Sequence, residues 1–314
     1  MAPRVGSIGQ ADGLRRLLSG LEQDAHGLAD RLPDLVLEAE RIAANVSHGI
    51  HGRRRAGPGE TFWQFRTYAS TDSAHTIDWR RSASSDQLYV REREWEASHS
   101  LWLWPDLSPS MDFNSHLATV TKRDRALVLM FACAELLVRS GERVALLGLT
   151  RPTTSRRAAS QLAEALAGAA ASGRPGLFES LPPETALSRF SGAILFSDFL
   201  DPPEHLRARL EALASNGVEG HIVQVLDPAE ETLAYTGRTE FVGMEGGERW
   251  VAERAESLRE AYAERLNAHR AELMELTQRI GWSFLVHHTD RSPAEAVLAL
   301  MARLQGGEMK GARS

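Results

Sequence analysis

The sequence predicts an α/β protein with a mostly parallel β-sheet and helices on both faces, joined to a small β-rich module and an N-terminal helical arm. From residue 98 onward, strands that are apolar along their whole length alternate with helical segments, as in sheets that helices cover on both faces. The strands are followed by polar, turn-forming residues. The 314 residues include 43% hydrophobic and 25% charged residues, which is typical of a globular chain.

The pattern divides the chain into three segments. Residues 1–47 are polar but place apolar side chains at helical spacing, which predicts the helical arm. Residues 48–97 open with a basic, turn-rich stretch and continue with aromatic and β-branched residues in partial alternation, which predicts the small β-rich module. Residues 98–306 carry the alternating strands and helices and form the predicted α/β domain.

The elements of this domain follow one another in a regular order. The expected strands are residues 100–105, 143–149, 193–200, 221–227 and 282–288. The expected helices are residues 122–141, 160–170, 202–217, 255–280 and 292–304. Proline at the start of the third helix and glycine after the first and third helices are typical helix boundaries. A hairpin is expected around residues 232–242.

Composition excludes several classes of protein. A formal net charge of −6 at pH 7 argues against a nucleic-acid partner, because such binding usually needs a basic surplus. One cysteine excludes a disulfide scaffold and a zinc site made of thiolates. The longest apolar stretch, residues 126–138, is interrupted by Glu135 and is too short to cross a membrane. We therefore expect a cytoplasmic chain without a membrane span.

Polar side chains follow two of the expected strands. Asp106, Ser108 and Ser110 come directly after the first strand, and Asp198 lies near the end of the third. Ligands of open parallel sheets bind beyond the carboxyl ends of the strands, at the point where the strand order reverses. These hard oxygen donors suit Mg²⁺, with Mn²⁺ or Ca²⁺ as alternatives. Aspartate and serine are also common turn and helix-cap residues, so a purely structural role is the alternative.

The spacing Asp106-x-Ser108-x-Ser110, with Asp198 after a later strand, resembles the metal-ion-dependent adhesion site of von Willebrand factor A domains. The resemblance implies a von Willebrand A-like, Rossmann-type sheet. It also implies a metal site completed by a threonine from a middle loop. Thr153 and Thr154 both stand in the segment that corresponds to this loop, and we favour Thr154.

A second signature precedes this site, and its residues are Tyr68, Asp72, Ile77, Asp78, Trp79 and Arg80. Together with residues 106–111 it resembles bacterial domain-of-unknown-function family 58. The resemblance implies association with MoxR-type AAA+ ATPases, which act in chaperone-like assembly or maturation of protein complexes. It implies no established catalytic activity. Trp79 and Arg80 are either a partner-binding pair, since both types are frequent in interface hot spots, or a structural clamp with Trp79 buried between domains.

The leading hypothesis is a non-enzymatic interaction protein. Mg²⁺ held by Asp106, Ser108, Ser110 and Thr154, with Asp198 acting through water, would bind an acidic group on a MoxR-type ATPase or one of its client proteins. One alternative is a metal-dependent hydrolase that acts on phosphoesters. Another is an ion-free scaffold that binds through the β-rich module. The sequence has no P-loop, H-E-x-x-H or G-x-S-x-G motif.

Overall fold

The structure is a computed structural model that describes residues 27–47, 63–68, 77, 79–83, 87–93, 99–189, 191–244 and 247–311. Contacts between Cα atoms divide the chain into two compact units. The larger unit comprises Met1–Ser47 and His99–Ser314, and the smaller unit comprises His48–Ser98. The helix over residues 27–47 therefore groups with the α/β unit by its contacts.

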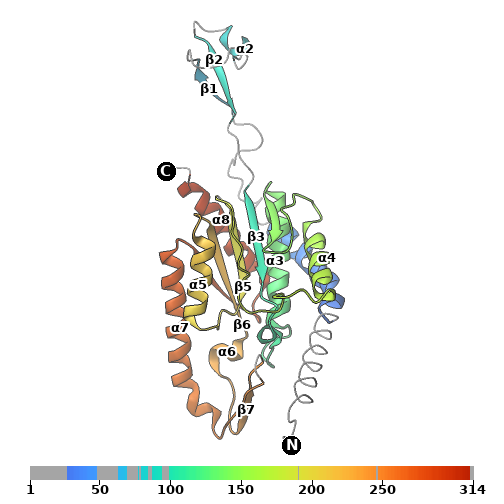
Figure 1. Ribbon diagram of the computed structural model, residues 1–314, viewed down its shortest axis with the longest axis vertical. Helices are drawn as coiled ribbons and strands as arrows, with labels where there is room; N and C mark the ends of the chain where they lie inside the picture. Colours follow the sequence, from blue (N-terminus) through green and yellow to red (C-terminus); the bar gives the residue numbers. More distant parts are fainter. Residues whose placement is uncertain are drawn as a thin grey trace, which may run out of the picture. The chain divides into compact units, whose positions relative to one another are not determined.

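A five-stranded sheet forms the centre of the larger unit (Figure 1). Its strands are β3 (Ser100–Pro105), β4 (Arg143–Leu146), β5 (Gly192–Ser197), β6 (Glu219–Leu226) and β9 (Ser283–His288). They lie in the order β4-β3-β5-β6-β9, and every neighbouring pair is parallel. This pairing confirms the predicted parallel α/β sheet. Strands that are apolar along their length are typical of a sheet that helices cover on both faces.

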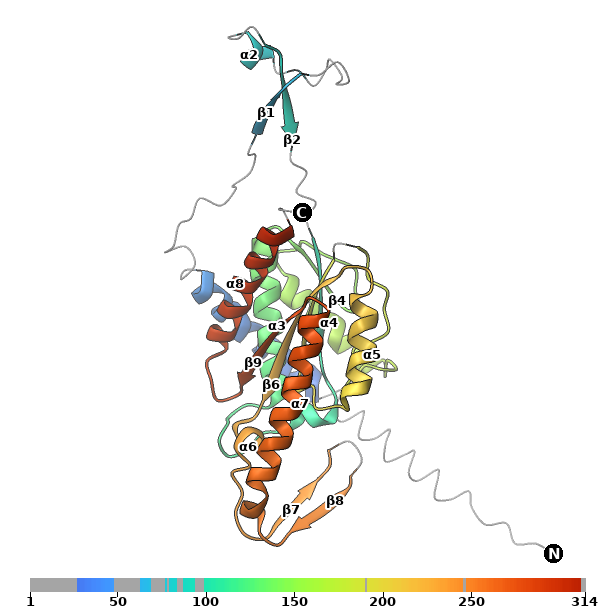
Figure 2. The same ribbon diagram turned by 90° about the vertical axis from the view of Figure 1, so that its left-hand side faces the viewer.

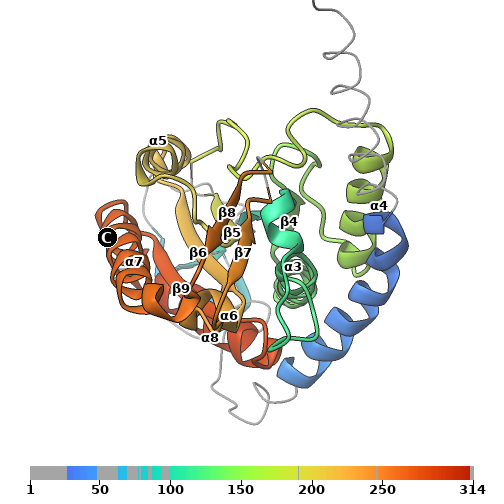
Figure 3. The same cartoon turned by 90° about the horizontal axis from the view of Figure 1, so that it is seen from below.

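Helices cover both faces of the sheet, as Figure 3 shows from below. On one face lie the helix over residues 27–47, α3 (Lys122–Arg139), α4 (Ala158–Ala171) and α8 (Pro293–Gly311). On the other face lie α5 (Pro203–Ala214) and α7 (Arg259–Arg279). Leucines of α5 and α7 pack there with Trp104, Leu195 and Trp282 in one apolar cluster. Among the described residues, no helix is both long enough and apolar enough to cross a membrane.

Helix α3 is buried on nearly all sides, which explains why its sequence is apolar around its whole circumference. Thr121 caps its amino end, since the side chain of Thr121 accepts a hydrogen bond from the backbone N–H of Asp124. Beyond its end, Gly141 adopts a φ of 94°, a left-handed conformation that glycine adopts readily. The first turn carries four charged residues that are all buried, Lys122, Arg123, Asp124 and Arg125.

The connections make the carboxyl ends of β3 and β5 a natural place for a ligand. The chain passes from β3 to β4 on one side and then returns to add β5 on the other side of β3. The strand order therefore reverses between β3 and β5, and the loops that follow them diverge to leave space. Asp106 and Asp198 are the first residues after these two strands.

Short elements surround this edge of the sheet (Figure 2). They are the 3₁₀ helices η2 (Pro109–Asp112) and η3 (Ala255–Leu258), helix α6 (Pro228–Thr232), and strands β7 (Thr239–Val242) and β8 (Arg249–Ala252). The expected hairpin around residues 232–242 exists, but its strands are β7 and β8, paired antiparallel. Only the last four of the expected residues form a strand, so the hairpin lies later in the chain than expected, and Thr232 is the last residue of α6.

The smaller unit contains β1 (Trp63–Thr67) paired antiparallel with β2 (Tyr89–Arg93), and the short helix α2 (Trp79–Ser82). The backbone N–H of Tyr89 donates to the hydroxyl of Ser82, so α2 is tied to the start of β2. Two members of the predicted signature, Asp72 and Asp78, lie outside the described residues.

Candidate functional site

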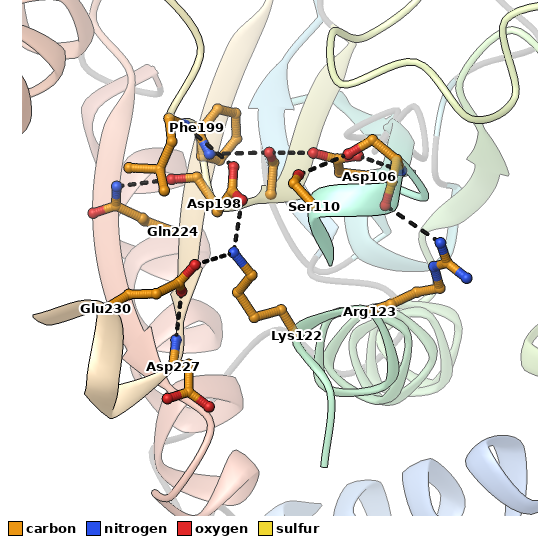
Figure 4. Close-up of polar contacts among 12 residues, drawn as sticks. Asp106, Ser110, Lys122, Arg123, Asp198, Phe199, Gln224, Asp227 and Glu230 are labelled. Carbon is orange, nitrogen blue, oxygen red and sulfur yellow. Dashed lines mark hydrogen bonds and ion pairs between the residues drawn. The ribbon is translucent and has the colours of Figure 1, made fainter. Parts of the chain in front are cut away.

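The carboxylate of Asp106 is completely buried between β3 and β5 (Figure 4). Its Oδ1 accepts the backbone N–H of Ser108 at 2.8 Å, and its Oδ2 accepts the hydroxyl of Ser197 at 2.6 Å. The backbone N–H of Asp106 donates to the carbonyl of Phe196 at 2.8 Å, which extends the sheet pairing by one residue. These three bonds fix the position of the carboxylate at the reversal of strand order.

The loop after Asp106 brings two hydroxyl groups together. Pro109 starts η2, and the Oγ atoms of Ser108 and Ser110 lie 3.1 Å apart. From α3, the guanidinium of Arg123 donates to the carbonyls of Leu107 and Ser108, at 3.0 and 3.3 Å, and holds the loop in this shape. Two hydroxyl oxygens and a carboxylate thus lie on one short turn.

Asp198 is nearly buried after β5 and is held from several directions. Its Oδ1 accepts the backbone N–H of Leu200 at 3.2 Å, and its backbone carbonyl accepts the amide of Gln224 at 2.8 Å. Phe199, the next residue, has a φ of 50°, an unfavourable left-handed conformation for a residue with a large side chain. Its carbonyl lies 2.6 Å from Nε2 of His269, and its side chain is buried, so packing holds this turn in place.

Lys122 supplies a positive charge inside this edge of the sheet. Its side chain is 1% exposed, and its ammonium donates to Asp198 at 2.8 Å and to Glu230 at 2.6 Å. Burial on its own would lower the pKa of Lys122. The charges of Asp198 and Glu230, and the hydrogen bonds to them, outweigh burial and raise this pKa above its usual value. The ammonium therefore stays charged.

Glu230 is held by the carboxyl end of a third strand, β6. Its Oε2 accepts the backbone N–H of Asp227 at 2.9 Å in the capping box of α6. Asp227 in turn accepts the N–H and the hydroxyl of Ser115 at 2.8 and 2.6 Å. A continuous set of polar contacts therefore joins the ends of β5 and β6 to α3 and to the loop that precedes it.

The electrostatics of the site are dominated by carboxylates close to one another. Burial, and then the nearby charge of Asp198, raise the pKa of Asp106 to about 7. Asp198 and Glu230 contact the ammonium of Lys122, and with Asp106 they give the group a formal charge of −2 when all four side chains are ionised. Burial raises the pKa of Glu230 as well, although Lys122 opposes this shift. Uncompensated buried charge is unfavourable, and a bound cation is a common means of compensation.

The donor set fits a hard cation in part. Asp106, Ser108, Ser110 and Asp198 offer carboxylate and hydroxyl oxygens, the ligand types that Mg²⁺ prefers. Within the described ranges, no group of three or more His, Cys, Asp or Glu side chains forms a ready metal site. An ion here would therefore depend on the serine hydroxyls, on water and on a ligand from outside the chain.

A cavity of about 420 Å³ opens beside these residues. Ser110, Lys122, Asp198 and Glu230 supply its polar lining. Its apolar and aromatic lining includes Phe113, Leu233, Tyr235, Phe241 and Tyr262. Phe241 contacts Tyr235 edge-on and stacks on Trp250 of the hairpin, with both centroid distances 5.8 Å. Trp250 is largely exposed, so aromatic side chains lead from the cavity to the surface.

Four of the five predicted metal ligands come together, and one does not. Ser110 and Asp198 line the same cavity, and Asp106 and Ser108 lie on the loop that carries Ser110 (Figure 4). The placement of Thr154 was wrong. The chain turns back after β4, so that Thr153 pairs antiparallel with Val144, which pairs with Leu101 near the start of β3. Asp106 lies five residues beyond Leu101, roughly 16 Å further along the strand direction.

Trp79 and Arg80 belong to the smaller unit, at the start of α2. Both side chains are exposed, and the exposed fraction of Trp79 is 63%. Trp79 is therefore not part of the interior of its own unit.

Sequence reasoning missed Lys122, Asp227 and Glu230. Signals for all three were present. Asp227 is a third carboxylate directly after a buried strand, and Asp227 with Glu230 three residues later is a capping-box pattern. Lys122 begins a run of four charged residues ahead of a helix that is apolar on all sides, and such residues need partners when they are buried.

The fold and site together define an α/β protein with a cavity, lined by both charged and aromatic side chains, where the order of a parallel sheet reverses. The chain belongs to the family described as Protein of unknown function DUF58, whose model matches residues 64–272, more than half of its length.

Relatives and a solved structure give further similarities. Uncharacterized proteins from Mycobacterium tuberculosis and Mycobacterium bovis are 27% identical over 298 residues, which cover 90% of this chain and 92% of theirs. A crystal structure of the conserved hypothetical protein BatB from Bacteroides thetaiotaomicron is 14% identical, with a TM-score of 0.36. That match covers 67% of this chain and all of the other, and it is too distant to inform on function.

Proposed function

We propose that this chain is a non-enzymatic interaction protein that binds an acidic group of a partner through a divalent cation at the carboxyl ends of β3 and β5. The observation that supports the proposal is the buried cluster of Asp106, Asp198, Glu230 and Lys122, whose formal charge is −2. One divalent cation would neutralise it. The two serine hydroxyls beside Asp106 offer further oxygen ligands of the appropriate type.

In this proposal the site is a von Willebrand A-like adhesion site. Asp106, Ser108 and Ser110 would hold Mg²⁺, Mn²⁺ or Ca²⁺, and Asp198 would contribute through a water molecule. The ammonium of Lys122 would continue to donate to Oδ2 of Asp198. The ion supplies an open coordination position for the partner's carboxylate. The surrounding residues exclude part of the water, which strengthens that electrostatic attraction.

The cavity suggests how the rest of the partner is contacted. Tyr235, Phe241 and Tyr262 line it, and the exposed Trp250 extends the aromatic surface along the hairpin. Aromatic side chains often dominate the energy of protein interfaces. We propose a MoxR-type AAA+ ATPase, or a client protein of one, as the partner. This part of the proposal rests on the family resemblance and places the chain in complex assembly or maturation in the cytoplasm.

The first test is the binding of Mg²⁺ to the purified chain, measured by titration calorimetry. We expect one ion per chain, and we expect Asp106→Asn to weaken binding about tenfold or more because it removes a ligand and a charge. Asp290→Asn is the matched control, since it removes the same charge from an exposed position. Equal affinity in the native chain and Asp106→Asn would contradict the proposed site.

A further inference from the structure

We infer that Lys122 and Glu230 set the net charge of the cation site, so that it accepts a single divalent ion and holds it weakly until a partner supplies a carboxylate. The inference rests on the proposed function. It adds a role for two residues that are not proposed ligands.

Lys122 is placed to act as a built-in cation. Its ammonium lies 2.8 Å from Oδ2 of Asp198 and therefore already occupies one side of the carboxylate that would support the ion. The side chain is 1% exposed, so water screens this charge poorly. A positive charge fixed beside Asp198 repels a second cation and lowers the affinity of the site for it.

Glu230 is placed to act in the opposite direction. Its Oε1 lies 2.6 Å from the Lys122 ammonium, and its Oε2 is held by the backbone N–H of Asp227. It offsets the charge of Lys122 and brings a third carboxylate to the site. Because α3 is buried and α6 is fixed by its capping box, neither side chain sits on a freely moving segment.

The charge count then predicts an order of affinities. With all four groups ionised, the native site has a formal charge of −2, which matches one divalent ion. Lys122→Met leaves −3, Glu230→Gln leaves −1, and the double variant returns the site to −2. If net charge controls binding, the double variant resembles the native chain although it lacks both side chains. If Lys122 acts instead by positioning Asp198, both variants that lack it lose affinity.

The experiment is titration calorimetry with Mg²⁺ on the full chain and the three variants, after thermal unfolding has shown that each is folded. We expect Lys122→Met to bind about tenfold more tightly or better, and Glu230→Gln about tenfold more weakly or worse. We expect the double variant to lie within about threefold of the native chain. Lys122→Met should raise the affinity of the site for Tb³⁺ more than its affinity for Mg²⁺, because the repulsion by Lys122 scales with the charge of the ion.

The outcomes separate this inference from the proposed function. If the native chain binds Mg²⁺ but Lys122→Met binds no more tightly, the inference is overturned and the proposed function stands. The inference is also overturned if the double variant binds Mg²⁺ as tightly as Lys122→Met does, because the two sites differ in formal charge. If only Lys122→Met binds, the native site does not accept the ion, and both the inference and the proposed function are overturned. If no protein in the series binds, both fail.

Discussion

Two histidines in the strands of the larger unit are buried and neutral. Burial, with a smaller effect from Arg303, lowers the pKa of His221 to about 4. Burial lowers the pKa of His287 to about 3, with smaller effects from Arg125 and His288. His221 shares a hydrogen bond of 2.7 Å with Ser283, whereas Nε2 of His287 has no hydrogen-bond partner among the described residues. Protonation of either histidine therefore requires unfolding or strain.

This arrangement predicts that the free energy of unfolding decreases as the pH is lowered. Both pKa values lie below the unfolded value of 6.5, so the contribution is complete above pH 6.5 and is lost as pH falls toward 4 and then 3. Each histidine contributes a slope of up to about 1.4 kcal/mol per pH unit to the free energy of unfolding. We expect His287→Leu to flatten this slope in urea unfolding measured from pH 7 to 4.5. His116→Gln, at an exposed position, is the control and should leave the slope unchanged.

At the same scale, the sequence could predict some site residues and not others. Asp106, Ser108, Ser110 and Asp198 directly follow buried strands, and parallel strands bring such residues to one edge. Lys122 begins a helix, and its approach to Asp198 depends on how that helix packs over the sheet. Thr154 was wrong because a short antiparallel return beside β4 carries no strong sequence signal.

At the level of elements, the indole of Trp282, the residue before β9, packs directly on Gly220 of β6. A Cβ atom added there would lie 1.9 Å from Cδ2 of Trp282. Trp282 cannot move aside easily, because it is buried and its indole N–H donates to the carbonyl of Val218 at 2.8 Å. Gly220 therefore allows a tryptophan to fill the core at the amino end of the sheet.

We expect Gly220→Ala to lower the free energy of unfolding by about 3 kcal/mol, the upper end of typical overpacking effects. Gly168→Ala is the matched control. Gly168 lies inside α4, where an added Cβ meets no atom within 4 Å, so alanine should stabilise the helix by about 0.5–1 kcal/mol. Urea denaturation of both variants measures the difference. Equal stabilities would show that Trp282 can repack.

The sequence predicted the elements of the sheet well because its strands are apolar throughout and its helices have clear boundaries. The hairpin was harder to predict. Of the expected residues 232–242, only Thr239–Val242 form a strand, because Thr232 ends α6 and Leu233 after it adopts a left-handed conformation. Elements with a strong local signal were thus predictable, whereas short ones depended on competing local preferences.

At the scale of the whole molecule, two units offer two possible places for a partner. The larger unit carries the proposed cation site, and the smaller unit exposes Trp79 and Arg80. An ion-free scaffold that binds through the smaller unit is the alternative to the proposed function. Variants in each unit distinguish the two.

We expect a purified MoxR-type ATPase from the same organism, with ATP and Mg²⁺, to bind the native chain and to be released by chelation. Asp106→Ala should weaken this binding about tenfold or more, as expected when a metal ligand is lost. Trp79→Ala and Arg80→Ala should change it by less than about threefold, since surface substitutions away from an interface have small effects. Surface plasmon resonance measures the affinities. The reverse pattern, with binding unaffected by chelation, would favour the scaffold.

The helix over residues 27–47 has a consequence for biosynthesis. It packs against α3, where Arg31 forms an ion pair with Asp124, yet the whole smaller unit separates the two in the chain. Its apolar stripe is buried in the finished fold but leaves the ribosome before α3 does. Translation of the residues up to the end of α3 takes on the order of ten seconds. For that interval the surface that covers this apolar stripe has not yet been made, so the helix can dock only after α3 is synthesised.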